Sequence, residues 1–249
     1  MDAPAAVKPV KIRRWLPYWA VFQNDVTQTL HSWVYRTWVL VTLLAGGGYL
    51  FYQFGVHQEA GIIQPASQWV GELLRWTVLG SVTLIILLTV GSISAERGSM
   101  ADSVLSRGIS RYQYFLGKLH ARLLAVLLTY FLLGAAGVVG SYFLLQGDLS
   151  WEGSAVALAT VAAVLAAVVT CGVTASALFN NTLLGSAVLW VLVYGVGFAL
   201  GVQKPLDHLQ YVLQGKYDLG AQLHFIGYAA ALSVPVTLVG MLYFARRDV

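Results

Sequence analysis

Six apolar stretches, separated by polar or turn-like segments, dominate the pattern along the chain. A helix needs about 20 mainly apolar residues to cross the hydrocarbon core of a bilayer. Stretches of roughly this length lie at 34–56, 76–93, 119–145, 154–178, 183–202 and 225–244. The pattern therefore predicts an all-α membrane protein with six transmembrane helices. We expect a cytoplasmic N-terminus at 1–33 and one six-span domain at 34–249, with a cytoplasmic loop at 94–118 and an outer loop at 203–224.

The segment before the first span predicts an amphipathic helix. Its large apolar residues recur at steps of three and four, which is one stripe of a helix, and they are Trp15, Trp19, Phe22, Val26, Leu30 and Trp33. Five polar residues lie off this stripe, namely Gln23, Asn24, Asp25, Gln28 and His31. Such a helix suits the headgroup layer of a membrane. The same amphipathicity serves a passive anchor and a functional lever equally well.

Composition and charge support the membrane assignment and orient it. The 249 residues are 58% hydrophobic and only 10% charged, whereas soluble domains carry about 25% charged residues. Twelve of the 15 Lys and Arg residues lie before the first span, in the loop at 94–118 and its flank, or at the C-terminus. Because such residues concentrate on the cytoplasmic side, we expect both termini to be cytoplasmic. The net charge of +4 is then explained by orientation and does not predict nucleic-acid binding.

No Asp, Glu, Lys or Arg lies deep inside the six predicted spans. Charged residues at depth usually mark proton relays, ion sites or intramembrane catalysis. Their absence disfavours an ion-coupled carrier and a membrane protease. Small residues are frequent instead, among them Gly134, Gly137 and Gly140 in the third span and a G-x-x-x-G at 197–201. Such faces let helices pack closely, either within one subunit or between subunits.

The loop at 94–118 carries two helix-start signals. Ser99-Met-Ala-Asp102 resembles a capping box and would open a short helix that ends near Arg107 and Gly108. Ser110-Arg-Tyr-Gln113 is a second capping box, which predicts a helix that continues into the third span. The loop is therefore either a rigid element that passes force from a cytosolic partner or an ordinary positive-inside loop.

This loop also resembles the signature of type-two ABC exporter permeases, which have six helices. Twelve residues match that pattern: Glu96, Arg97, Gly98, Ser106, Arg107, Ile109, Ser110, Arg111, Tyr112, Leu116, Gly117 and Lys118. The chain departs from it at Gly108, where Pro is usual, and at Ala101, where Glu is usual. The N-terminal amphipathic helix, the span count and the cytoplasmic termini agree with the same family.

The resemblance implies a transmembrane subunit that dimerises, with itself or with a related permease, and binds a separate cytosolic ABC ATPase. The implied coupling residues are Glu96, Arg97, Gly98, Ser99, Met100, Asp102, Leu105, Ser106, Arg107, Ser110, Arg111 and Lys118. We expect a multi-pass protein of the cytoplasmic (inner) membrane that is not itself an enzyme and has no cofactor. The sequence agrees, because it lacks the G-x-x-x-x-G-K-[ST] phosphate-binding motif.

One alternative function and one further segment complete the expectations. A non-transporting anchor or mechanical transducer, which docks an ATPase to an envelope partner, also fits spans lined by small residues. In the outer loop, Leu206, Leu209 and Leu213 suit a short amphipathic helix, which could gate an exit or simply cap the surface. Cys171 is the only cysteine, which excludes a disulfide within the chain, and the five scattered histidines do not predict a metal site.

Overall fold

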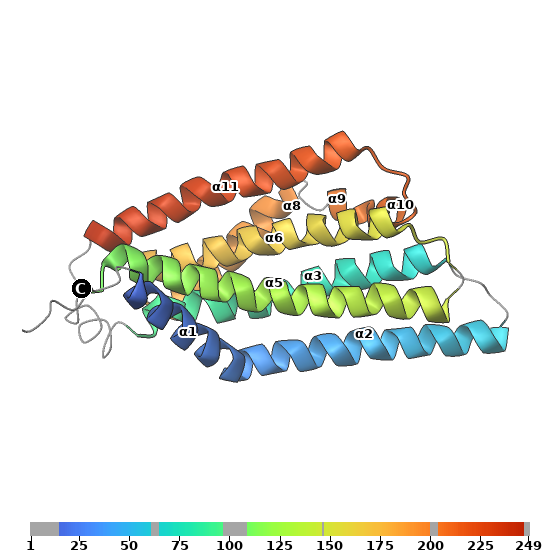
Figure 1. The fold of residues 1–249 in the computed structure, drawn as a ribbon, viewed down its shortest axis with the longest axis horizontal. Coiled ribbons are helices and arrows are strands. Elements are labelled where there is room, and N and C mark those ends of the chain that lie inside the picture. The colour runs from blue at the N-terminus through green and yellow to red at the C-terminus, as the bar shows by residue number, and fades with distance from the viewer. Residues whose placement is uncertain (1–14, 61–64, 97–108, 146, 200–203, 247–249) are drawn as a thin grey trace, which may run out of the picture.

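The computed structural model describes residues 15–60, 65–96, 109–145, 147–199 and 204–246, and these form helices joined by turns. In chain order the elements are α1 (Leu16–His31), α2 (Trp33–Ala60), α3 (Ala66–Ser94), α5 (Arg111–Leu144), α6 (Trp151–Leu178), α7 (Thr182–Val191), the π-helix η1 (Leu192–Val196), α8 (Gly197–Ala199), α9 (Lys204–Asp207), α10 (Leu209–Leu213) and α11 (Leu219–Arg246). The long helices run side by side along one axis (Figure 1).

Five helices of the described chain are long and apolar enough to cross a membrane. They are α2, α3, α5, α6 and α11, and they correspond to five of the six predicted spans. The protein is therefore a multi-pass helical membrane protein. The remaining predicted span, 183–202, corresponds to α7, η1 and α8, which follow one another without a break from Thr182 to Ala199. The count of six spans stays a prediction.

All five helices extend beyond the predicted spans, and each extension includes at least one charged residue. Helix α3 begins at Ala66 and so includes Glu72 and Arg75. Helix α5 begins at Arg111 and includes Lys118 and Arg122. The sequence predicts that no charged residue lies deep inside a span, and these four lie near the helix starts. They are included because packing and capping prolong a helix beyond its most apolar stretch.

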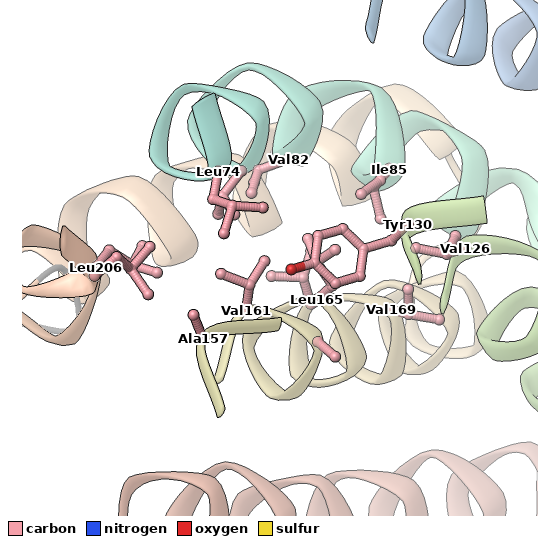
Figure 2. Close-up of a cluster of buried hydrophobic side chains, with 14 of the residues drawn as sticks. Leu74, Val82, Ile85, Val126, Tyr130, Ala157, Val161, Leu165, Val169 and Leu206 are labelled. Carbon is pink, nitrogen blue, oxygen red and sulfur yellow. The ribbon is translucent and has the colours of Figure 1, made fainter. Parts of the chain in front are cut away.

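The core of the bundle lies between α3, α5 and α6. Side chains from the three helices meet there, including Val82 and Ile85 of α3, Val126 and Tyr130 of α5, and Leu165 of α6 (Figure 2). Helices α3 and α6 approach closely at Gly172, where an added Cβ would overlap the side chain of Thr89. By contrast, α2 and α11 lie at the two sides of the bundle (Figure 1), and few of their described residues are fully buried.

The segment that begins with α7 follows α3 in the opposite direction. Thr182 Oγ1 lies 2.7 Å from Ser94 Oγ at the last residue of α3. Further along, Trp190 Nε1 donates to Thr83 Oγ1 at 3.2 Å, and Tyr194 OH donates to the carbonyl oxygen of Leu79 at 2.6 Å. The segment therefore moves away from the C-terminal end of α3 towards its middle.

Helices α9 and α10 close the opposite end of the bundle. Leu206, Leu209 and Leu213 are buried there, so the predicted amphipathic helix is present, although His208 divides it into two short pieces. Asp148 ties this end together: its carboxylate accepts hydrogen bonds from the Ser67 N–H at 2.9 Å and from Gln214 Nε2 at 3.0 Å. Gly215 ends α10 with a positive φ of 76°, which suits glycine.

Helix α1 lies at an angle to α2 and against the first turns of α5 (Figure 1). The chain turns at Ser32, whose backbone is extended between the two helices. The predicted stripe of large apolar residues points away from the bundle; Trp15, Trp19 and Trp33 are exposed by 69%, 53% and 77%. This exposure fits a helix whose tryptophans face the headgroup layer.

Candidate functional site

A buried cluster of charged residues joins α1, α5 and the end of α3. Asp25 of α1 is only 1% exposed, and Lys118 of α5 only 2%. Lys118 Nζ lies 3.0 Å from Asp25 Oδ1 and 2.8 Å from Glu96 Oε1, so one ammonium group bridges two carboxylates. Arg122, one turn further along α5, lies with Nε 3.0 Å from Asp25 Oδ2 and donates from Nη2 to Oδ1 at 3.2 Å. Two cations and two anions thus neutralise one another, and of the four only Glu96 is partly exposed, by 23%.

Helix periodicity explains how the sequence assembles this cluster. Residues four apart lie on one helix face. Tyr114, Lys118 and Arg122 have this spacing on α5, and Val21, Asp25 and Thr29 have it on α1, where all three are buried. Gly117 allows the two helices to approach, because a Cβ there would lie 2.9 Å from Val21 Cγ1.

Tyr114 also binds Glu96, the residue at the start of the predicted coupling loop. Its hydroxyl donates to Glu96 Oε2 at 2.6 Å, and Lys118 Nζ lies 5.3 Å from the centre of its ring. Glu96 therefore has both carboxylate oxygens engaged, one by Lys118 and one by Tyr114. The chain is fixed to α5 at the point where it leaves α3.

The other end of the loop is fixed by the predicted second capping box. The Gln113 N–H donates to Ser110 Oγ at 3.2 Å, and the Ser110 N–H donates to Gln113 Oε1 at 3.4 Å. This box is confirmed, and α5 runs on from it as the sequence predicts. Arg111 then donates from Nη1 to the carbonyl oxygen of Ala245 at 3.1 Å, which ties the start of α5 to the end of α11.

Aromatic packing strengthens the contact between α5 and α11. Phe244 is buried and stacks on Tyr114, with ring centres 5.8 Å apart. Phe115 also packs against the ring of Phe244, with ring centres 6.4 Å apart. A change in the position of α5 would therefore reach α1 through the ion pairs and α11 through the aromatic rings.

The structure brings together four of the twelve residues that the sequence assigns to coupling. Glu96 and Lys118 form an ion pair, and Ser110 and Arg111 fix the start of α5. The other eight lie outside the described residues: Arg97, Gly98, Ser99, Met100, Asp102, Leu105, Ser106 and Arg107. Lys118 and Arg122, counted among the positive charges of the loop, point into the protein and are buried.

Sequence reasoning missed Asp25 as a member of this site. It treated Asp25 as part of the polar side of an interfacial helix, whereas α1 has a third face that packs on α5. The sequence signal that could have found it is the four-residue spacing of Val21, Asp25 and Thr29 on α1, together with two cations that are also four residues apart on α5. Thr29 also supports the site, because its hydroxyl donates to the Asp25 carbonyl oxygen at 2.6 Å.

The described residues hold no group of three or more His, Cys, Asp or Glu side chains placed to bind a metal ion. Charged and aromatic contacts connect the two ends of the loop to α5, and connect α5 to α1 and α11.

No protein-family model matches the chain, and no curated protein matches it in sequence.

Proposed function

We propose that this chain is the transmembrane permease subunit of an ATP-binding-cassette exporter, which uses ATP hydrolysed by a separate cytosolic subunit. The observation that supports the proposal best is the attachment of both ends of the loop to α5, by ion pairs at one end and by a capping box at the other. Glu96 lies at the start of the loop and is bound to α5, and Ser110 lies at its end and caps the same helix. A load applied to the loop would therefore move α5 and, through Asp25, α1.

The proposal includes six crossings with both termini in the cytoplasm. The contacts of α7 and η1 with Ser94, Thr83 and Leu79 follow α3, itself a candidate span, over half its length. Asp207 of α9 then pairs with Arg75, nearer the start of α3. A sixth crossing through 182–199 explains this path. The C-terminal end of α11 lies at the same end of the bundle as α1 and the start of α5 (Figure 1). The positive charges at that end make it the cytoplasmic one.

Cysteine labelling tests the number of crossings. With Cys171 replaced by serine, an impermeant maleimide is expected to label Lys216→Cys in intact cells and to label Tyr112→Cys only after permeabilisation. Both positions are exposed, so neither is protected by the fold. Six spans place them on opposite sides. Labelling of Lys216→Cys that needs permeabilisation would contradict the six-span topology.

The exporter proposal also requires a second membrane subunit, because one pathway needs walls on both sides. We place a second copy of this chain, or a related permease, opposite it in the cytoplasmic membrane. Exposed apolar side chains on α2 and α7, such as Leu44 and Leu183, supply surface for either lipid or a partner helix.

A non-transporting transducer is the second candidate, and one observation favours it. A groove of about 540 Å³ between α6, α7 and α11 has almost wholly apolar walls, among them Val164, Leu189 and Leu232. Such walls suit lipid or another helix better than a polar cargo. In this alternative the same ion-pair cluster would transmit ATPase movement to an envelope partner without any passage of substrate.

Charge reversal in the loop tests the coupling. The tagged chain purified from its own host is expected to bring an ATP-binding-cassette ATPase with it. Arg107→Glu, or the pair Ser99→Ala and Asp102→Ala, is expected to reduce this co-purification about tenfold or more, because reversing or removing one partner of an interface charge pair costs about 2–5 kcal/mol. The proposal places these residues at the ATPase interface and outside the bundle, so yield is expected to stay near that of the native chain.

Lys216→Glu is the matched control, since it reverses an exposed charge at the opposite end of the bundle. It is expected to leave ATPase binding unchanged. Loop variants that bind the ATPase as well as the native chain does would remove the main support for both candidates. Vesicles containing the complex then separate the two, because only the exporter moves substrate in response to ATP.

A further inference from the structure

We infer that the groove between α2 and α3 is a binding site for a cationic amphiphile, with the alkyl body between the helices and the positive head at Glu72. This inference concerns binding by the chain alone, and it does not depend on the proposed coupling to an ATPase.

The first observation is a carboxylate in a candidate span that has no counter-charge among the residues that the structure describes. Glu72 lies two turns into α3 and is partly buried. Its Oε2 accepts from Tyr49 OH at 2.7 Å, and its Oε1 accepts from Gln68 Nε2 at 3.3 Å. Both donors are neutral, and the nearby Arg75 pairs with Asp207. Among the described residues Glu72 therefore has no cationic partner, whereas an ionisable group in a membrane span usually has one or binds a ligand.

The second observation is the aromatic surroundings of this carboxylate. Tyr49, which binds Glu72, lines the groove, and the buried Trp69 holds it in place by stacking, with ring centres 5.9 Å apart. Ring faces attract ammonium groups, and the attraction is stronger where water is excluded. The long bond to Glu72 Oε1 leaves that oxygen able to accept from an ammonium head or to lie against a quaternary one.

The third observation is the groove that leads away from Tyr49. It has a volume of about 390 Å³, and its walls include Tyr49, Leu73, Trp76, Gly80 and Leu84. At 1.5 Å per residue, the stretch of α3 that lines it is about 16 Å long.

The groove suits an apolar ligand and opens towards the lipid. At its far end Trp38 Nε1 already donates to Ser81 Oγ at 2.8 Å, so this polar pair needs no further partner. Val41 and Trp76 are exposed at its rim, which opens it towards the lipid. Glu72 is hydrogen-bonded to Tyr49, which lines one end of the groove, and apolar walls lie beyond Tyr49. This arrangement matches a molecule with a positive head and a long chain, which distinguishes it from a small cation or a neutral lipid.

The test uses the full chain in nanodiscs of zwitterionic lipid, with a brominated dodecyltrimethylammonium as probe. Binding is expected to quench tryptophan fluorescence with a saturable component, whereas partition into the bilayer gives quenching that does not saturate. Glu72→Gln keeps the acceptor for Tyr49 but removes the charge, and it is expected to weaken the saturable binding about tenfold. Glu152→Gln, an exposed carboxylate on α6, is the control and is expected to have no effect.

A second variant tests the groove separately from the charge. An added Cβ on Gly80 meets no atom within 4 Å, so Gly80→Leu is expected to fill the groove without disturbing the fold and to abolish saturable quenching. Tetramethylammonium, which lacks the chain, is not expected to compete. Equal binding of a neutral dodecyl probe, or of the probe by Glu72→Gln, would overturn the inference. Loss of a crosslinked dimer in Gly80→Leu with unchanged probe binding would assign the groove to a second copy instead.

Discussion

Replacing Asp25 with asparagine is expected to lower the midpoint of thermal unfolding in detergent by about 10 °C. Asp25 faces both Lys118 and Arg122 within a site that excludes solvent. Its neutralisation leaves two buried cations with Glu96 as their only carboxylate in the cluster. Removing one partner of a buried ion pair typically costs about 3–5 kcal/mol, and in a protein of this length each kcal/mol shifts the midpoint by about 2–4 °C.

The matched control for Asp25→Asn is Asn24→Ala, because Asn24 is the adjacent residue of α1 and is exposed. Its substitution is expected to change the midpoint by no more than about 2 °C, since exposed substitutions usually stay within about 0.5 kcal/mol. The double variant Asp25→Asn and Arg122→Gln restores equal numbers of positive and negative groups. It is therefore expected to unfold at a higher temperature than Asp25→Asn alone. A midpoint for Asp25→Asn equal to that of the control would mean that the cluster does not hold α1 in place.

The stretches of the chain that form long apolar helices could be predicted from the sequence, because a helix that crosses lipid must be long and apolar. Five predicted spans have counterparts in long helices, and the capping box at Ser110 forms as the side chains indicate. The start of α3 could not be predicted, because residues before 76 include Glu72 and Arg75 and interrupt the apolar pattern. The helix reaches back to Ala66 since its first turn is bonded by Asp148, a residue from the loop before α6.

The predicted 183–202 span shows a second limit. Its apolar composition resembles that of the others, yet it changes from α to π geometry at Leu192. A π-helix is a local change in backbone register that hydropathy does not report. Here Tyr194, within the π-helix, donates to the carbonyl oxygen of Leu79 on α3. That contact exists only once the two helices have packed.

The candidate site illustrates the same limit for charges. Counting Lys118 and Arg122 as cytoplasmic charges predicts the orientation of the protein in the membrane. It does not predict whether the two side chains point into the protein or away from it. Their burial depends on α1 lying across α5, a tertiary contact permitted by Gly117. A sequence pattern places residues on a helix face, but only packing decides whether that face meets water, lipid or another helix.

Gly172→Ala is expected to destabilise the bundle by about 2 kcal/mol, although alanine normally favours a helix over glycine by about 0.5–1 kcal/mol. The new Cβ would overlap Thr89, and Thr89 is fully buried with its hydroxyl bonded to the carbonyl oxygen of Ile85 at 2.8 Å. Rotation of Thr89 does not relieve the overlap, because the Cβ of Thr89 itself would lie only 2.6 Å away. Helices α3 and α6 must therefore separate, and the core between them loosens.

Gly80→Ala supplies the control of opposite sign, since a Cβ there meets open space. It is expected to leave the unfolding midpoint unchanged or to raise it slightly, as helix propensity alone predicts. The compensating pair Gly172→Ala and Thr89→Gly removes the Cβ that causes the overlap, so its cost is expected to be smaller than the sum of the two single costs. Thermal unfolding of the native chain, the two single variants, the double variant and Gly80→Ala in one detergent gives this comparison. If the single costs add without compensation, or if Gly172→Ala matches Gly80→Ala, helices α3 and α6 do not pack at this glycine, and the central contact of the bundle is wrong.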